Sequence, residues 1–153
     1  MSETTSPSTP AYVTDELDRF PTARIMRLAR KLRRAFDEQL VPHGLTSVQF
    51  GLLNRLASAD GLVQAELSRR MAIEPATLTG ILQRLERDGW LRRSCDANNR
   101  RLQRVWLTEK ARAELEALRR LQERHRRRSL GGLTPGDLIQ LEILLDRIEA
   151  NLA

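Results

Sequence analysis

The sequence has few aromatic residues, a single cysteine and no long apolar run. Aromatic residues make up 4% of the 153 residues while hydrophobic residues reach 41%, a composition that suits a helical protein better than a sheet sandwich. Cys95 alone cannot close a disulfide within the chain, and no run of about 18 apolar residues marks a transmembrane helix. We therefore expect a helical protein of the cytoplasm, without a membrane partner.

Groups of residues that carry enzymatic chemistry are missing as well. The sequence has no glycine-rich phosphate loop, no serine or cysteine within a motif that supplies a base, and no distinctive pair of carboxylates. The two histidines, His43 and His125, are far apart and lack the spacing of metal ligands. We expect neither an enzyme nor a metal site, and no cofactor.

What the sequence does contain is positive charge. Its 26 Lys and Arg outnumber 20 Asp and Glu, which gives a net charge of +6, and nearly all of the 26 are arginine. Arginine is the residue type preferred for phosphates and bases, although a high arginine content also accompanies G·C-rich genomes. The basic run at 124–128 fits a solvated helix end, where positive charge suits the helix dipole.

The most informative stretch is 62–108, and its centre is a helix expected from Pro75 to just before Gly89. Proline suits a first helical position and glycine a helix end, and the apolar residues between them recur at helical spacing. The opposite face of this helix is short, polar and basic. It carries or is flanked by Ala76, Thr77, Thr79, Gly80, Gln83, Arg84 and Arg87.

The residues on either side of this helix complete a known motif. Residues 65–71 form a second short amphipathic pattern, expected to bury Ala65, Leu67 and Met71, and the turn 72–74 joins the two helices. Two short helices joined by a tight turn make a helix-turn-helix. Residues 90–94 and 104–108 read as two strands around the polar tip 96–101, so a basic hairpin, or wing, follows directly.

This stretch resembles the MarR-type regulators of bacteria. The resemblance lies in Pro-Ala-Thr-x-Thr at 75–79, in Leu-Glu-x-x-Gly at 85–89, and in a wing with Asp96, an arginine and a final Leu-Thr at 107–108. It implies a homodimeric, sequence-specific DNA-binding regulator, most often a repressor, with a pseudo-palindromic operator. It also implies release by a small aromatic or phenolic effector, although nothing in the sequence identifies one.

The resemblance assigns a role to each candidate residue in a complex with double-stranded DNA. Glu74 and Val63 stand where the family has better helix caps, and Asn99 replaces a second wing aspartate, which leaves Asp96 to brace the wing arginine. Base edges in the major groove would be approached by Ala76, Thr79, Gly80 and Gln83. Phosphates would be held by Thr77, Arg84 and Arg87, and the flanking minor groove would receive Arg101 together with Arg100.

The remaining chain predicts a mainly α fold with a small β-hairpin wing. Residues 1–19, rich in Ser, Thr and Pro, predict a disordered lead-in, and 20–153 predict one domain. Long helices are expected from about 21 to 41, 47 to 58, 108 to 130 and 134 to 152, the second with a Thr46–Gln49 capping box and Val48 pointing inward. The apolar stripes of 20–45 and 109–153 exceed what the winged helix-turn-helix at 46–108 can bury, which favours dimerisation helices.

Other functions fit the same residues. The polar helix face and its arginines are also compatible with a winged-helix module that docks a protein, or with non-specific nucleic-acid binding. Cys95 lies close to Arg92 and Arg93, which can lower a thiol pKa, so a redox-sensing role also stays open.

Overall fold

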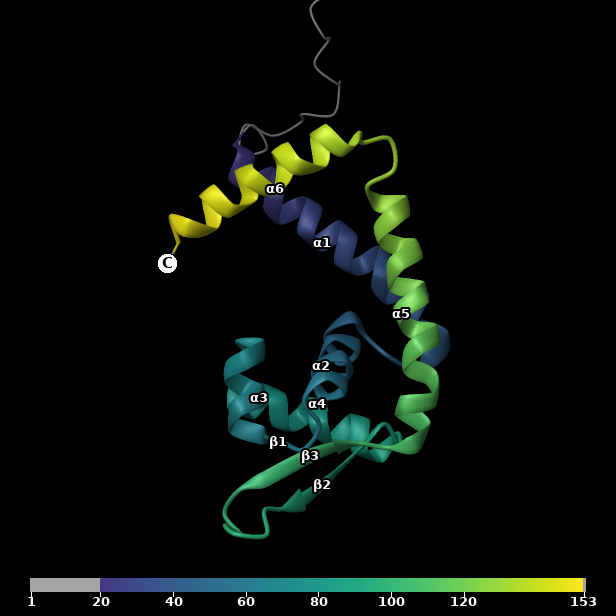
Figure 1. The fold of residues 1–153 in the computed structure, drawn as a ribbon, viewed down its shortest axis with the longest axis vertical. Helices are drawn as coiled ribbons and strands as arrows, with labels where there is room; N and C mark the ends of the chain where they lie inside the picture. Colours follow the sequence, from purple (N-terminus) through teal and green to yellow (C-terminus); the bar gives the residue numbers. More distant parts are fainter. Residues whose placement is uncertain (1–19, 153) are drawn as a thin grey trace, which may run out of the picture.

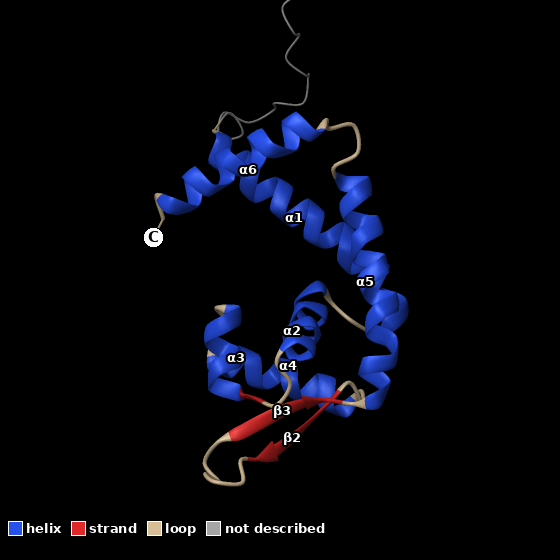
Figure 2. Ribbon diagram, viewed as in Figure 1, coloured by secondary structure: helices blue, strands red, loops and turns tan. Residues whose placement is uncertain are grey.

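The structure, a computed structural model, describes residues 20–152, so the lead-in expected at 1–19 lies outside the described residues. It is mostly helical and contains one small antiparallel sheet (Figure 2). In chain order the elements are α1 (Pro21–Leu40), the 3-10 turn η2 (Val41–His43), α2 (Ser47–Ser58), β1 (Leu62–Val63), α3 (Gln64–Met71), α4 (Pro75–Arg87), β2 (Leu91–Cys95), β3 (Gln103–Leu107), α5 (Glu109–Ser129) and α6 (Pro135–Ala150).

Two regions of the molecule are joined by α5 (Figure 1). One end holds α2, α3, α4 and the sheet, which we call the winged lobe. The other end holds the crossing helices α1 and α6, while α5 starts beside the sheet and runs up to the loop before α6. The β2–β3 hairpin projects from the winged lobe, away from α1 and α6.

Helix ends follow the capping chemistry of the sequence. The expected capping box is present at α2, where the Gln49 N–H donates to Thr46 Oγ1 over 3.3 Å and the Thr46 N–H donates to Gln49 Oε1 over 2.8 Å. A second box, formed by Thr134 and Asp137, begins α6. Glu74 and Val63, the poor caps, make no side-chain hydrogen bond at the starts of α4 and α3.

The sheet has three strands in the order β1–β3–β2, one more than the expected hairpin. The additional strand, β1, has two residues and pairs antiparallel with β3, with Leu62 opposite Val105. Gly61 makes this approach possible, because its backbone has φ +75° and a side chain there would collide with the Trp106 ring. A two-residue strand carries no periodicity, so only its pairing with β3 reveals it.

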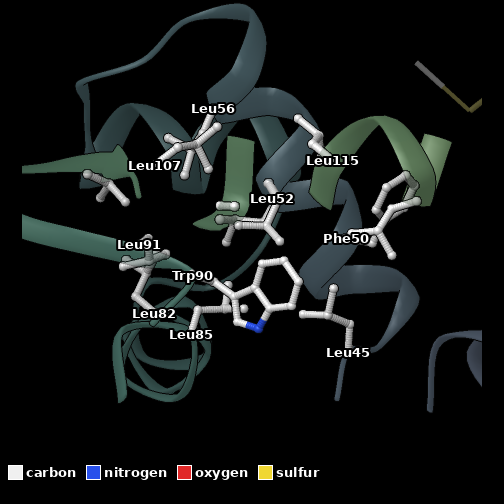
Figure 3. Packing of buried hydrophobic residues seen from close by; sticks show 14 of the residues in the cluster. Leu45, Phe50, Leu52, Leu56, Leu82, Leu85, Trp90, Leu91, Leu107 and Leu115 are labelled. Carbon is white, nitrogen blue, oxygen red and sulfur yellow. The ribbon is translucent and has the colours of Figure 1, made fainter. Parts of the chain in front are cut away.

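The hydrophobic core lies inside the winged lobe and extends along the first half of α5. Figure 3 shows Trp90 in the middle of the cluster, beside leucines of α2 and α4. Leu52, Leu67 and Leu82 are fully buried, as their spacing predicted. Two expectations were wrong: Val48 is 37% exposed and Ala65 is exposed, whereas Phe50 takes the inward position on α2 because it packs edge-on against Phe36 of α1.

The apolar stripes of the terminal helices stay exposed in the single chain. Helix α6 buries no residue, and Leu144 and Leu145 are each 44% exposed. On α1 only Phe36 and Leu40 are buried, whereas Ile25, Leu28 and Leu32 are exposed. The apolar surface that these leucines and isoleucines expose on α1 and α6 is larger than the contact between the two helices can cover. No helix among residues 20–152 is long and apolar enough to cross a membrane.

Candidate nucleic-acid interface

Helix α4 turns its polar face outward from the winged lobe. Its apolar side holds Leu78, Leu82 and Leu85 in the core, so the polar side faces outward. Among the predicted site residues, Ala76, Thr77, Gln83, Arg84 and Arg87 are exposed. We call this outward side of α4 the recognition face.

Gly80 lies in the middle of α4, where it presents no side chain. A methyl group placed on its Cα would meet no atom within 4 Å, so the space above the helix is open. Glycine inside a helix costs about 1 kcal/mol relative to alanine, and nothing in the described part of the chain packs against this position to offset that cost. The position therefore permits a close approach of another molecule to the helix backbone.

Thr79 is tied into the protein more firmly than the sequence suggested. Its hydroxyl donates to the Pro75 carbonyl oxygen over 2.9 Å and accepts from the Gln64 side-chain amide over 2.9 Å. The side chain is half-buried between α3 and α4. Sequence reasoning did not single out Gln64, and no local pattern identifies it, because its role comes from a contact fifteen residues away.

Ion pairs divide the arginines of the winged lobe into two groups. Arg69 and Arg70 both pair with Glu66, and the bond from Arg70 lowers the pKa of that carboxyl. Arg93 pairs with Glu86 over 2.7 Å and lowers its pKa in the same way.

Arg87, a predicted phosphate residue, belongs to the paired group. Its Nε donates to Asp88 Oδ1 over 2.8 Å, and this bond lowers the pKa of Asp88. The second group has no such partners: no carboxylate among residues 20–152 pairs with Arg84, Arg100 or Arg101. Arg55 also belongs to this group, as does Arg92, whose guanidinium lies 5.4 Å from the centre of the Trp106 ring. The side chains of Arg84, Arg100 and Arg101 are exposed to solvent.

The wing tip is held by Asp96, but not in the way the sequence suggested. The buried Asp96 carboxylate accepts the backbone N–H of Asn98 over 2.8 Å and that of Asn99 over 3.0 Å, and it pairs with Arg104. The bond from Arg104, and then the two backbone bonds, lower the pKa of Asp96. Asp96 therefore does not pair with Arg101, whose backbone N–H instead donates to Asn99 Oδ1 over 3.1 Å.

Arg104 links the wing to the rest of the lobe. Besides Asp96 it reaches the Gly61 carbonyl oxygen, to which Nη1 donates over 2.7 Å. Because Gly61 precedes β1, this contact ties the hairpin to the outer strand of the sheet. The pattern of the sequence pointed to an arginine at 100 or 101, and only the register of β2 against β3 places Arg104 next to Asp96.

Two hollows lie along the predicted DNA-contacting surface. One of about 500 Å³ brings Arg101 of the wing together with Gln64 at the start of α3 and Pro75 at the start of α4. The other, of about 510 Å³, places Thr77 and Arg84 beside the first turn of α2, with Thr46 and Ser47. The structure thus brings the predicted groove and phosphate residues onto neighbouring parts of one lobe.

A further hollow, of about 590 Å³, lies between α1 and α5, and we call it the α1–α5 hollow. Leu32 and Phe36 give it an apolar side, and Arg119 supplies positive charge, whereas Arg126 is paired over 2.9 Å with Glu123, which also lines the hollow. His125 is a further lining residue: its ring packs 5.1 Å from the ring of Phe36, and its Nδ1 is 3.0 Å from Gln39 Nε2.

Cys95 and His43 each lie near one polar side chain. The exposed Cys95 thiol lies at the outer end of β2, 3.3 Å from the Gln103 side-chain amide. His43 is 3.9 Å from Glu114 of α5. Within residues 20–152 no group of His, Cys, Asp and Glu side chains gathers in a way that would hold a metal ion.

Comparison with known proteins places this geometry among regulators. The family model of the MarR family matches residues 45–102. The chain is 32% identical to the HTH-type transcriptional repressor NicR of Pseudomonas putida, over 97% of this chain and 95% of that one.

Solved structures agree in fold. A probable transcriptional regulator from Pseudomonas aeruginosa is 29% identical, with a TM-score of 0.78 over 87% of this chain and 99% of that one. A mutant MarR from E. coli, solved in complex with operator DNA, is 27% identical, with a TM-score of 0.79 over 88% of this chain and 99% of that one.

Proposed function

The chain belongs to the MarR family of transcriptional regulators, and from that membership we propose that α4 and the wing of each subunit bind a pseudo-palindromic operator. The protein is a DNA-binding repressor and not an enzyme. We assign residues 46–108 to the winged helix-turn-helix and residues 20–45 and 109–153 to dimerisation. Because its target is chromosomal DNA, we place it in the cytoplasm.

The observation that carries this proposal is the distribution of paired and unpaired arginines. Arg93 and Arg104 are held by carboxylates and shape the lobe, whereas Arg84, Arg100 and Arg101 pair with no carboxylate among the described residues. Exposed arginines without a carboxylate partner are hydrated in the free protein, so they cost it little stability. They form charge-assisted hydrogen bonds when DNA phosphates bind. Their position beside the recognition face supports a duplex that contacts α4 and the wing at once.

Within the major groove, we assign base contacts to Ala76, Gly80 and Gln83. Gly80 admits the edge of the bases close to the helix backbone, and Gln83 has the donor and acceptor that pair with adenine. Thr79 contributes its methyl group and holds Gln64 in place, since its hydroxyl is already bonded. Thr77, Arg84 and Arg87 take phosphates, for which Arg87 would exchange its pair with Asp88.

In the minor groove, we assign Arg101, with Arg100 beside it. A narrow A·T-rich minor groove has an enhanced negative potential that attracts arginine. Asp96 and Arg104 contribute indirectly, because they hold the hairpin that carries these two residues.

Dimerisation accounts for the exposed stripes of α1 and α6. Ile25 and Leu28 of α1, with Leu141 and Leu144 of α6, already line one hollow of about 590 Å³, and a second subunit would cover it. A two-fold dimer presents two α4 helices, so operator half-sites should lie about 34 Å, or ~10 base pairs, apart.

The α1–α5 hollow supports a site for a small aromatic or phenolic effector. Its apolar side, with Phe36, suits an aromatic ring, and Arg119, with no carboxylate pair among the described residues, suits a carboxylate or phenolate. The hollow lies where α1 meets α5, the helix that carries the winged lobe, so a ligand there would change the lobe's orientation. Release of the operator by 4-hydroxybenzoate, reduced in Arg119→Gln, tests this assignment.

The experiment that tests the proposal is selection of binding sites from a genomic fragment pool, followed by a salt titration. We expect pseudo-palindromic sites that still bind near physiological salt. Uniform binding of all fragments would instead support non-specific nucleic-acid binding. Absence of binding even at low salt would support a protein-docking module and contradict the proposal.

A further inference from the structure

The side of α1 opposite its apolar stripe carries a concentration of positive charge that operator binding does not use. Arg27, Arg30, Lys31 and Arg34 recur at i, i+3, i+4 and i+7, so they lie on one side of the helix. The apolar stripe that contains Leu28 lies on the opposite side. Arg27 and Lys31, at the edge of the basic side, also line the hollow that a second subunit would cover, whereas Arg30 and Arg34 do not.

These cations border a hollow of about 450 Å³ that has no apolar lining residue. Its lining consists of the four residues named above with Arg33 and Asp37. No carboxylate among residues 20–152 pairs with Arg30, Lys31 or Arg33, and Arg34 pairs only with the exposed Glu38, over 3.1 Å. Asp37 accepts the Ser47 N–H, so its carboxylate is turned toward the start of α2.

The chemistry of this surface favours nucleic acid over protein. Protein interfaces have cores depleted of charge and rely on buried aromatic or aliphatic anchors, which this hollow lacks. Phosphate binding needs no such anchor, since it draws its affinity from released counterions. The row from Arg27 to Arg34 spans about 10 Å of helix, a length over which a duplex carries roughly six charges.

We propose that the basic side of α1 is a second, sequence-independent site for duplex DNA. Helix α1 lies at the other end of the molecule from the wing (Figure 1), so a dimer bound to its operator can hold a second duplex there. Simultaneous binding of an operator and a second duplex rests on the proposed function, since it requires that α4 and the wing bind the operator. Its consequence is that the dimer joins two DNA segments.

The test immobilises a biotinylated operator duplex from the selection, saturates it with protein, and measures capture of a fluorescein-labelled duplex of unrelated sequence. The variant is Arg30→Gln/Lys31→Gln/Arg34→Gln. The matched control, Arg124→Gln/Arg127→Gln/Arg128→Gln, removes the same number of charges from the end of α5. We expect the α1 variant to keep operator affinity within about twofold, to lose capture about tenfold or more at ~50 mM salt, and to lower the salt slope by about three.

Several outcomes would overturn the proposal. The proposal is wrong if wild-type protein binds the operator but captures no second duplex at ~50 mM salt. It is also wrong if the α5 control loses as much duplex capture as the α1 variant. Binding of poly-L-glutamate to the α1 surface without duplex capture would assign it to an acidic protein partner instead. If no operator can be selected, the proposed function fails but the second site is still testable. Direct binding of the unrelated duplex is then compared between wild type and the α1 variant, and equal binding would contradict the second site.

Discussion

The winged lobe and the α1–α6 region use leucine in opposite ways. In the lobe, leucines of α2, α4 and the sheet are buried together with Trp90 in one core. In α6 the leucines are as regular in sequence, yet none is buried. The same periodicity of leucines therefore forms a buried core in the lobe and an exposed apolar surface on α6.

The difference also separates two kinds of stability. The lobe closes its core with residues of one chain, so its folding needs no partner. The α1–α6 region buries only Phe36 and Leu40 within one chain, and the rest of its apolar surface is covered only on association, which depends on protein concentration. Substitutions in the two regions should therefore change different measurements.

The largest effect is expected from Leu144→Asp in α6. Burying one leucine contributes about 1.5–3 kcal/mol, and a two-fold contact counts each substitution twice, so the dimer should weaken by about 4 kcal/mol. Sedimentation should show monomer at micromolar concentration, with the winged lobe still folded by circular dichroism. Asp146→Ala is the control and should leave the dimer intact; a wild-type protein that is itself a folded monomer would refute the interface.

The next effect is expected from Leu52→Ala in the lobe. This side chain is fully buried, and truncating such a leucine costs about 3 kcal/mol of unfolding free energy through lost burial and a cavity. Urea unfolding at fixed protein concentration measures it. Val48→Ala, on the same helix but 37% exposed, should cost less than about 1 kcal/mol. Equal costs at the two positions would contradict the burial pattern of α2.

Within the lobe, Arg101→Ala tests the wing. We expect a loss of roughly 1–3 kcal/mol on the selected operator, greatest where the flanks are A·T rich, and a salt slope smaller by about one. Arg87→Ala should lose on the order of 1 kcal/mol, evenly across sequences, because phosphates carry no sequence. Arg127→Ala on α5 is the control. Binding that depends on Arg127 and ignores Arg101 would show that DNA docks elsewhere.

A smaller effect is expected from Gly80→Ala, which should raise the stability of the free protein and lower its affinity for the operator. The free protein should gain about 1 kcal/mol of stability, because alanine favours a helix and the added methyl meets nothing within 4 Å. Operator binding should weaken by about the same amount, because the methyl occupies space meant for the base edges. Thermal unfolding and fluorescence anisotropy measure the two quantities. Unchanged operator affinity would remove Gly80 from the contact surface.

The smallest effect is expected from Asp96→Asn, which keeps an oxygen for the backbone N–H groups but loses the charge opposite Arg104. The pKa of Asp96 is lowered in the folded protein, so its stabilisation is complete above the ordinary value of 3.8 and is lost as pH falls through the lowered pKa. Wild type should exceed the variant in unfolding free energy at neutral pH. The gap should close in strong acid; a gap that is independent of pH would exclude the ion pair as its cause.

The sequence by itself determined most of the elements and the side of each helix that could be polar. The capping residues at Thr46, Thr108 and Thr134 and the spacing of leucines act over a few residues, so helix bounds and the recognition face could be predicted locally. The candidate residues from Ala76 to Arg87 were predicted in the same way, because one helix carries them all, and their contacts with DNA stay a prediction.

Only the tertiary structure decided which contacts join distant parts of the chain. The pairing of β1 with β3, the choice of Arg104 over Arg101 as the partner of Asp96, and the hold of Gln64 on Thr79 depend on register and on neighbours far away in sequence. Exposure of the α6 leucines is of the same kind. Periodicity shows that a face is apolar, but whether the chain itself can cover that face depends on what the fold brings next to it.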